Sequence, residues 1–180
     1  MKILNNFWWI KKPNVKNKEW LYLFEEETRH SIMIEWYFAN KKEIQSTISS
    51  KKYSKNSEAI LWYFDSASLV YEFWYQKYIN NEKFELRHSD IKTIHSLMFR
   101  WQESKKPWDY RVWDIMINKA EIKPPVWSMV RDNLDYFLKF INSLNFKEDE
   151  IINSLSKLHT LFESIHPFED WNWRAWRVFL

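Results

Sequence analysis

Apolar side chains recur at steps of three and four residues along most of the chain, which is the spacing of one face of an α-helix. The longest stripe runs over residues 57–80, and others run over residues 89–100, 126–144 and 148–165. Their members are Ile60, Phe64, Ala67, Tyr71, Trp74 and Tyr78; Ile91, Ile94 and Met98; Val130, Leu134, Phe137, Ile141 and Leu144; and Ile151, Leu155, Leu158, Phe162 and Ile165. The pattern predicts an all-α fold whose helices each bury one face.

The stretches between these stripes predict further elements. Residues 18–38 are mostly good helix formers, and the Lys- and Ser-rich residues 41–56 predict a short helix followed by a loop. Ser89 followed by Asp90 is typical of a helix start, and Pro167 is expected to end the helix before it. A last helix is expected between that loop and the end of the sequence.

One segment has the alternation of a strand. Residues 107–110 predict a turn, residues 111–117 alternate enough for a short strand or hairpin, and two prolines at 124 and 125 end the segment. We therefore expect one small β-hairpin in an otherwise helical protein.

Composition narrows the possible functions. The chain has 180 residues and no cysteine, so disulfides, zinc–thiolate sites and cysteine nucleophiles are excluded. The net charge of +3 is too small to favour nucleic-acid binding. We find neither the apolar core of a signal peptide nor an apolar run of about 18 residues, and so expect a cytoplasmic protein without a membrane partner.

Polar chemistry is concentrated in residues 166–177, HPFEDWNWRAWR, directly after a well-patterned helix. A loop that leads into a helix start there would present unpaired backbone N–H groups and the positive end of the helix dipole. The two arginines in the same stretch add positive charge. The segment therefore predicts a binding site for an anion such as phosphate.

The chain has no glycine and 13 tryptophans. We hypothesise that a codon read as glycine in the source was translated here as tryptophan. With glycine at positions 171, 173 and 176 the segment reads HPFEDGNGRAGR, which resembles the HPFx[D/E]GNGRxxR signature of the Fic/Doc (Fido) family.

This resemblance implies a fold and an activity. Family members are mostly helical bundles with a small β-hairpin flap, and they transfer AMP from ATP to a hydroxyl side chain of a target protein. Here the flap corresponds to residues 108–118, which would dock the target carrying the Ser, Thr or Tyr hydroxyl. Residues 57–180 would form the catalytic core, C-terminally incomplete after the motif, and residues 1–56 a lead-in with an inhibitory helix.

The resemblance also implies residue roles. His166 would be the general base, Asp170 would hold Mg²⁺, and Phe168 would anchor the loop in the core. The residues expected to bind the phosphates of ATP, through backbone or side chain, are Trp171, Asn172, Trp173, Arg174 and Arg177.

A second motif lies near the start of the chain. Ser31 and Glu35 are four residues apart, so both project from one helical face. With glycine at 36, residues 31–36 resemble the inhibitory [S/T]xxxE[G/N] motif of some Fic proteins. The resemblance implies that Glu35 pairs with Arg177 and keeps it from the γ-phosphate of ATP.

Two alternatives stay open. The shared motif indicates which residues bind phosphates better than it indicates which donor molecule is used, so transfer of another phosphate-containing group is one alternative. If the tryptophans are literal, a non-catalytic Fic-like binding module is expected, because a left-handed backbone costs a residue other than glycine about 1–2 kcal/mol and an indole would fill the phosphate site. His88 and His95 are expected to be packing or surface residues. The target, the adenine-binding residues and the oligomeric state, a homo-oligomer included, stay open.

Overall fold

The computed structural model describes residues 18–34, 37–50, 56–83, 85–98, 109–117, 123–144 and 150–179, with side chains from residue 25 onward. Within these ranges the protein is helical and contains no strand, which confirms the predicted all-α class. The chain divides into two compact units, Met1–Glu82 and Lys83–Leu180. None of the described helices has the length and apolar character that a bilayer span requires.

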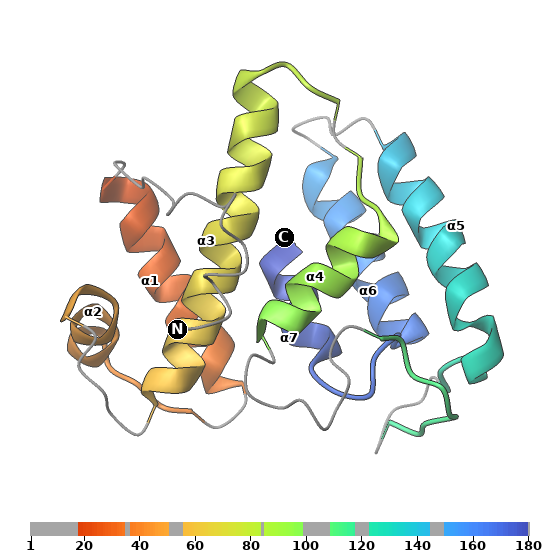
Figure 1. Cartoon of the computed structure of the whole chain (residues 1–180), viewed down its shortest axis with the longest axis horizontal. Coiled ribbons are helices and arrows are strands. Elements are labelled where there is room, and N and C mark those ends of the chain that lie inside the picture. Colours follow the sequence, from red (N-terminus) through yellow and green to blue (C-terminus); the bar gives the residue numbers. More distant parts are fainter. Residues whose placement is uncertain are drawn as a thin grey trace. The chain divides into compact units, whose positions relative to one another are not determined.

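The first unit consists of α1 (Lys18–Met33), α2 (Lys41–Ser50) and α3 (Ser57–Ile79), which pack on one another (Figure 1). All the buried residues of α3 lie between Ser57 and Val70. The predicted stripe continues further, but Tyr78 near its end is 81% exposed. The helical period was therefore predicted correctly, whereas only the first part of the stripe is core. Because α3 belongs to the first unit, the chain divides later than residue 57.

The second unit contains α4 (His88–Met98), the short 3₁₀ helix η3 (Trp127–Met129), α5 (Val130–Ser143), α6 (Ile151–Ile165) and α7 (Asn172–Phe179). Helix α5 lies beside α6, and α7 contacts both α6 and α4 (Figure 1). The residues that fill this core and are at most 2% exposed include Ile91, Leu97, Met98, Leu134, Phe137, Leu158, Phe162, Phe168 and Trp176. The predicted stripes of α4 and α5 are buried over most of their length, whereas that of α6 is buried only from Leu158 onward.

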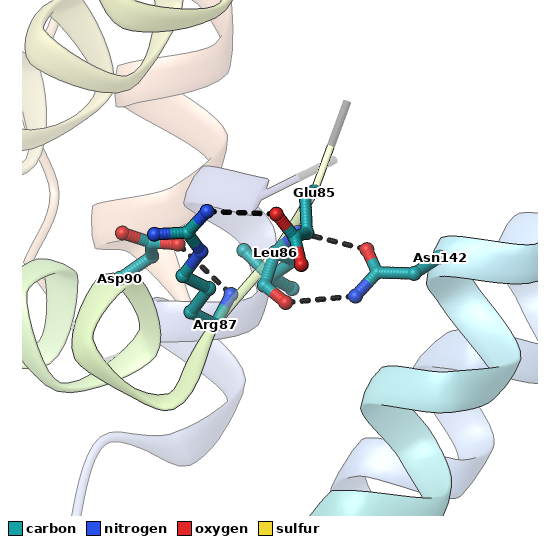
Figure 2. A network of polar contacts seen from close by, with 5 residues as sticks. All are labelled: Glu85, Leu86, Arg87, Asp90 and Asn142. Atoms are coloured by element: carbon teal, nitrogen blue, oxygen red, sulfur yellow. Dashed lines mark hydrogen bonds and ion pairs between the residues drawn. The ribbon is translucent and has the colours of Figure 1, made fainter. Parts of the chain in front are cut away.

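The start of the second unit is fastened by side chains (Figure 2). The Asn142 amide of α5 accepts a hydrogen bond from the backbone N–H of Leu86 and donates one to its carbonyl, both at 2.8 Å. The Asp90 carboxylate accepts the N–H of Arg87 at 2.8 Å, and Arg87 pairs with Glu85. Asp90 therefore caps α4, which begins at His88, one residue before the predicted Ser89.

The expected hairpin is not observed among residues 109–117, whose backbone forms no strand. Here side chains satisfy groups that a sheet would otherwise pair. Asp114 accepts the backbone N–H of Trp127 at 2.8 Å, and the buried Arg111 side chain donates to the carbonyl of Trp113 at 3.1 Å. The alternation in the sequence therefore did not produce a strand among these residues, whose backbone is irregular with a bend at Trp113. Residues 118–122 lie outside the described part of the chain.

Candidate functional site

The predicted anion-binding segment forms a tight loop between α6 and α7. Helix α6 ends at Ile165, as Pro167 predicted, and His166 caps it with a left-handed backbone of φ 47° and ψ 64°. The N–H of His166 donates to the carbonyl of Phe162 at 3.0 Å. This turn reverses the chain, so residues 166–171 lie between the end of one helix and the start of the next.

Phe168 anchors this loop, as expected. Its ring is fully buried and stacks on the His95 imidazole of α4, with centroids 3.6 Å apart and planes 4° apart. The Nε2 of His95 lies 3.0 Å from the carbonyl oxygen of Asp170. Since a carbonyl only accepts hydrogen bonds, Nε2 carries the proton of this tautomer. His95 is thus a packing residue, as expected, and it also positions the loop.

Asn172 closes the loop from the other side. Its Oδ1 accepts the N–H of Phe168 at 2.8 Å, and its Nδ2 donates to the carbonyl of Phe168 at 2.9 Å. The side chain is buried, and both of its polar atoms are engaged with the loop itself. Asn172 therefore shapes the loop, which leaves the backbone N–H groups at the start of α7 as the donors of the predicted anion site.

His166 is half-buried, and its Nδ1 makes no hydrogen bond to any described residue. Burial lowers the pKa of His166, and the positive charge of Arg111 lowers it further. The Glu163 backbone and the Asp170 carboxylate oppose this shift. A lowered pKa keeps the imidazole neutral at neutral pH, which is the form that accepts a proton.

Asp170 lies just before α7, with one carboxylate oxygen accepting the N–H of Trp171 at 2.8 Å. No group of three or more His, Asp or Glu side chains that could hold a metal occurs among the described residues. Mg²⁺ does not require such a group, since it usually takes one or two protein carboxylates and completes its shell with water and substrate phosphates. Asp170 as its ligand stays a prediction.

The three tryptophans of the motif lie in different environments. Trp171 has a left-handed backbone with φ 58°, where glycine is favoured. Trp173 lies in the first turn of α7, and its φ is not positive. In the chain as written, Trp171 but not Trp173 therefore has the left-handed geometry that glycine favours.

Arg174 is 5% exposed, and its guanidinium carbon lies 4.0 Å from the ring centroid of Trp171 and 5.5 Å from that of Trp173. Indoles thus cover the guanidinium that was expected to bind phosphate. Arg177, one turn further along, is half-buried. Burial lowers the pKa of His159, and the positive charge of Arg177 lowers it further.

Trp176 is a core residue. It is 1% exposed and packs against Phe162 of α6 at 5.3 Å and Phe137 of α5 at 5.6 Å between ring centroids. Its indole N–H has no hydrogen-bond partner among the described residues. Trp176 therefore fills the interior rather than the anion site.

The loop lies within a region that matches a known protein family. The model of the Fic/DOC family matches residues 85–180, more than half of the chain. The chain belongs to the Fic/DOC family. The match begins where the second unit does, within a few residues.

Two relatives extend the comparison. The chain is 28% identical over 159 residues to a probable protein adenylyltransferase of Aquifex aeolicus (strain VF5), covering 88% of this chain and 47% of that protein. The fold of this chain matches the crystal structure of a Fic domain-containing signaling protein from Bacteroides thetaiotaomicron VPI-5482, with a TM-score of 0.67 and 17% identity. That match covers 89% of this chain and 62% of the other. The chain thus spans about half to two thirds of the length of these relatives.

The predicted inhibitory motif lies in the first unit. Ser31 is buried, and its hydroxyl donates to the Glu27 carboxylate at 3.1 Å. The same Glu27 oxygen accepts the hydroxyl of Tyr63 at 3.0 Å, which ties α1 to α3. Glu35 lies outside the described residues, so its pairing with Arg177 stays a prediction.

Sequence reasoning missed two residues of this Fic site. Arg111 is 2% exposed, and its Nε donates to the carbonyl of His166 at 2.8 Å. His95 supports the loop as described above. His95 lies beside Ile91, Ile94 and Met98 on α4, and a histidine within an apolar stripe was the available signal. For Arg111 the signal was its place in the PWDYR segment, which resembles the PGxxR start of the family's flap.

Proposed function

We propose that this chain is a Fic-type adenylyltransferase, which transfers AMP from ATP to a hydroxyl side chain of a target protein. The observation that carries the proposal is the loop 166–171. It places a half-buried histidine of lowered pKa and an acidic residue immediately before a helix start, within the family's signature. A base beside a phosphate-binding helix start is what nucleotidyl transfer to a hydroxyl requires.

In the proposed reaction His166 takes the proton from the target hydroxyl. The hydroxyl oxygen forms a bond to the α-phosphorus of ATP, and the bond from that phosphorus to the bridging oxygen breaks. The electron pair of the broken bond leaves with pyrophosphate. His166 suits this role because burial and the Arg111 charge lower its pKa, so the base is available at neutral pH.

The phosphates of ATP would lie at the start of α7. Its first N–H groups and helix dipole favour anions, and Arg174 and Arg177 would bind the β- and γ-phosphates. Asp170 would hold Mg²⁺, which neutralises phosphate charge when bound. The single carboxylate at this position fits that ion, since the phosphates supply further ligands.

The target protein would dock along residues 108–118. Among the described residues of this segment, Val112, Trp113 and Met116 are exposed, Met116 by 87%. The segment from residue 109 to 117 is not part of a sheet, and the backbone of residues 114–117 would pair with an extended peptide by strand addition, whereas the Arg111 N–H and the Trp113 carbonyl are already bonded. Apolar side chains on such a segment favour a target with apolar residues beside its hydroxyl.

A second candidate function is a non-catalytic binding module, and the stacking of Arg174 on Trp171 favours it for the chain with literal tryptophans. In that form an indole covers the cation that would bind phosphate. If the natural residues at 171 and 173 are glycines, the guanidinium is released for ATP. Transfer of another phosphate-containing group is the remaining alternative.

The test is incubation with Mg²⁺ and ATP carrying radiolabel on either the α- or the γ-phosphate, using the chain as written and a version with glycine at 171 and 173. We expect the glycine version to label itself or an added protein from α-labelled ATP only. His166→Ala should abolish labelling, while His159→Ala, which changes a half-buried histidine within α6, should retain it. Incorporation of the γ-label, or full labelling by His166→Ala, would contradict the proposal.

A further inference from the structure

Arg111 is a buried cation whose hydrogen-bond partners are all backbone carbonyls. Its Nε donates to His166 at 2.8 Å. One terminal nitrogen donates to Pro125 at 2.6 Å and to Ile165 at 3.4 Å, and the other donates to Trp113 at 3.1 Å. Its own backbone N–H donates to the carbonyl of Pro167 at 2.9 Å.

These partners belong to three separate parts of the second unit. Trp113 lies in the irregular segment 109–117, Pro125 lies just before η3, and Ile165 and His166 are the last residue of α6 and its cap. One side chain therefore holds Trp113 within the proposed docking segment, and Pro125 beyond it, against the residue that carries the proposed base.

The charge of Arg111 is compensated without a direct ion pair. No carboxylate among the described residues forms a salt bridge with it, and Asp114 acts only at longer range. The last carbonyls of α6 form the negative end of the helix dipole, which stabilises a cation there. Charge-assisted hydrogen bonds of this kind are stronger than neutral ones, and a planar guanidinium makes several at fixed angles.

We propose that Arg111 is a positioning residue, which couples residues 111–117 of the proposed docking segment to the placement of His166. This inference rests on the proposed transfer reaction and adds a residue to it. A target strand that pairs with residues 111–117 takes its position from their backbone, and the Arg111 side chain holds that backbone at the Trp113 carbonyl. The same guanidinium holds the His166 carbonyl, so the distance from the target hydroxyl to the imidazole depends on Arg111.

The coupling predicts a specific kinetic pattern. Phosphate binding uses the start of α7, whose donors do not contact the Arg111 side chain, so the KM for ATP should change little. Misplacement of a reacting group by about 1 Å can cost about 100-fold in rate. Loss of the Arg111 side-chain hydrogen bonds should therefore lower kcat/KM for the target strongly. A residue that merely stabilised the fold would affect both substrates alike.

The first experiment measures amide hydrogen exchange in the whole chain as written, with Arg111→Met, Arg111→Lys and the control Arg87→Met. Arg87 is an exposed arginine of the same unit, whose ion pair with Glu85 contributes little. We expect exchange to rise about tenfold or more in both Arg111 variants at two amides, that of residue 111, which donates to Pro167, and that of Trp127, which donates to Asp114, with α5 and α6 unchanged. Unchanged exchange at these two amides, or an equal rise throughout α5 and α6, would overturn the proposal.

The second experiment measures kinetics on whichever form labels from ATP. Arg111→Lys should raise the KM for the target and lower kcat, with the KM for ATP within about twofold. Added methylguanidine should partly restore Arg111→Ala and leave Arg87→Met unaffected. An equal rise in both KM values, or no rescue, would count against Arg111 as a positioning residue. If no form labels, the proposed function fails, while the exchange experiment still decides whether Arg111 holds the segment.

Discussion

At the scale of single residues, the candidate base is surrounded by groups that set its protonation. His166 has a lowered pKa because it is buried and lies near Arg111. Glu163, one turn earlier on α6, is affected in the opposite direction: burial raises its pKa to about 7, and its Oε1 makes no hydrogen bond to a described residue. Two ionisable groups on the last turn of one helix are thus both held toward their neutral forms.

Glu163 makes a prediction about stability. A carboxyl whose pKa is raised in the folded state favours folding at low pH, and this contribution is lost as the pH rises from about 4.5 through about 7. Glu163→Gln should therefore raise the free energy of unfolding at pH 8 by about 1–2 kcal/mol and change it little near pH 4. Urea denaturation at the two pH values measures this. An equal effect at both would show that Glu163 acts by packing rather than by charge.

His166 contributes a pH dependence of stability with the opposite sign. Because its pKa is lowered on folding, the unfolded chain binds more protons just below pH 6.5, and stability falls as the pH decreases through that range. The comparison of Glu163→Gln with the parent should therefore be made at the same pH for both proteins, so that the His166 contribution cancels.

The motif tryptophans make a second prediction. Replacing Trp171 and Trp173 together by glycine should uncover Arg174 and allow Mg·ATP binding, which calorimetry of the chain as written should not detect. Trp176→Gly is the matched control, because Trp176 lies in the core: it should cost about 3–5 kcal/mol of stability and add no ATP affinity. Tight Mg·ATP binding by the literal tryptophan form would show that these indoles belong to the site.

At the scale of elements, single polar side chains hydrogen-bond to the backbone of connecting segments that pair with no described helix or strand; we call each such side chain a clip. Asn142 fastens residue 86 to α5, Asn172 closes the loop before α7, and Asp114 holds the start of η3. Each side chain pairs with backbone groups, as a neighbouring strand would. These clips explain how a protein without strands among its described residues keeps its connecting segments ordered.

The clip at Asn142 can be tested by itself. Asn142→Ala leaves the N–H and carbonyl of Leu86 without their partner, which should cost about 1–3 kcal/mol of stability. Amide exchange of Leu86 should rise at the same time. Asn133→Ala on the same helix is the control, since Asn133 only donates to the carbonyl of Met129 one turn before it. Equal losses from the two variants would mean that the clip contributes nothing specific.

At the scale of the whole molecule, the proposed inhibitor and the proposed site belong to different units. Ser31 is fixed within the first unit through Glu27 and Tyr63, and Arg177 belongs to the second. Inhibition by Glu35 would therefore depend on how the two units come together. This arrangement would let the first unit regulate the second without taking part in the chemistry.

The regulatory prediction follows from the charge of Glu35. Glu35→Gly should raise labelling from ATP, because it would free Arg177 for the γ-phosphate. The control is Glu82→Gly, which removes an exposed carboxylate of the first unit outside its helices. Labelling at saturating ATP is the measurement, made in the form with glycine at 171 and 173. Unchanged activity would mean that the resemblance at residues 31–36 is coincidental.

The sequence by itself determined the helices and the place of the site. Helical periodicity is a local property, so the stripes of α4 and α5 and the end of α6 before Pro167 could be predicted from neighbouring residues. The motif at 166–177 likewise lies in one short run, and the family that it indicated is confirmed by the match over residues 85–180.

Only the tertiary structure decided which residues hold the site in shape. His95 meets Asp170 across 75 residues of sequence, and Arg111 meets His166 across 55, so no local pattern pairs them. The same reason makes the burial of Trp176 invisible in the sequence, because it depends on Phe137 and Phe162 of two other helices. Side chains that work through long-range contacts become visible only when the chain has brought their partners together.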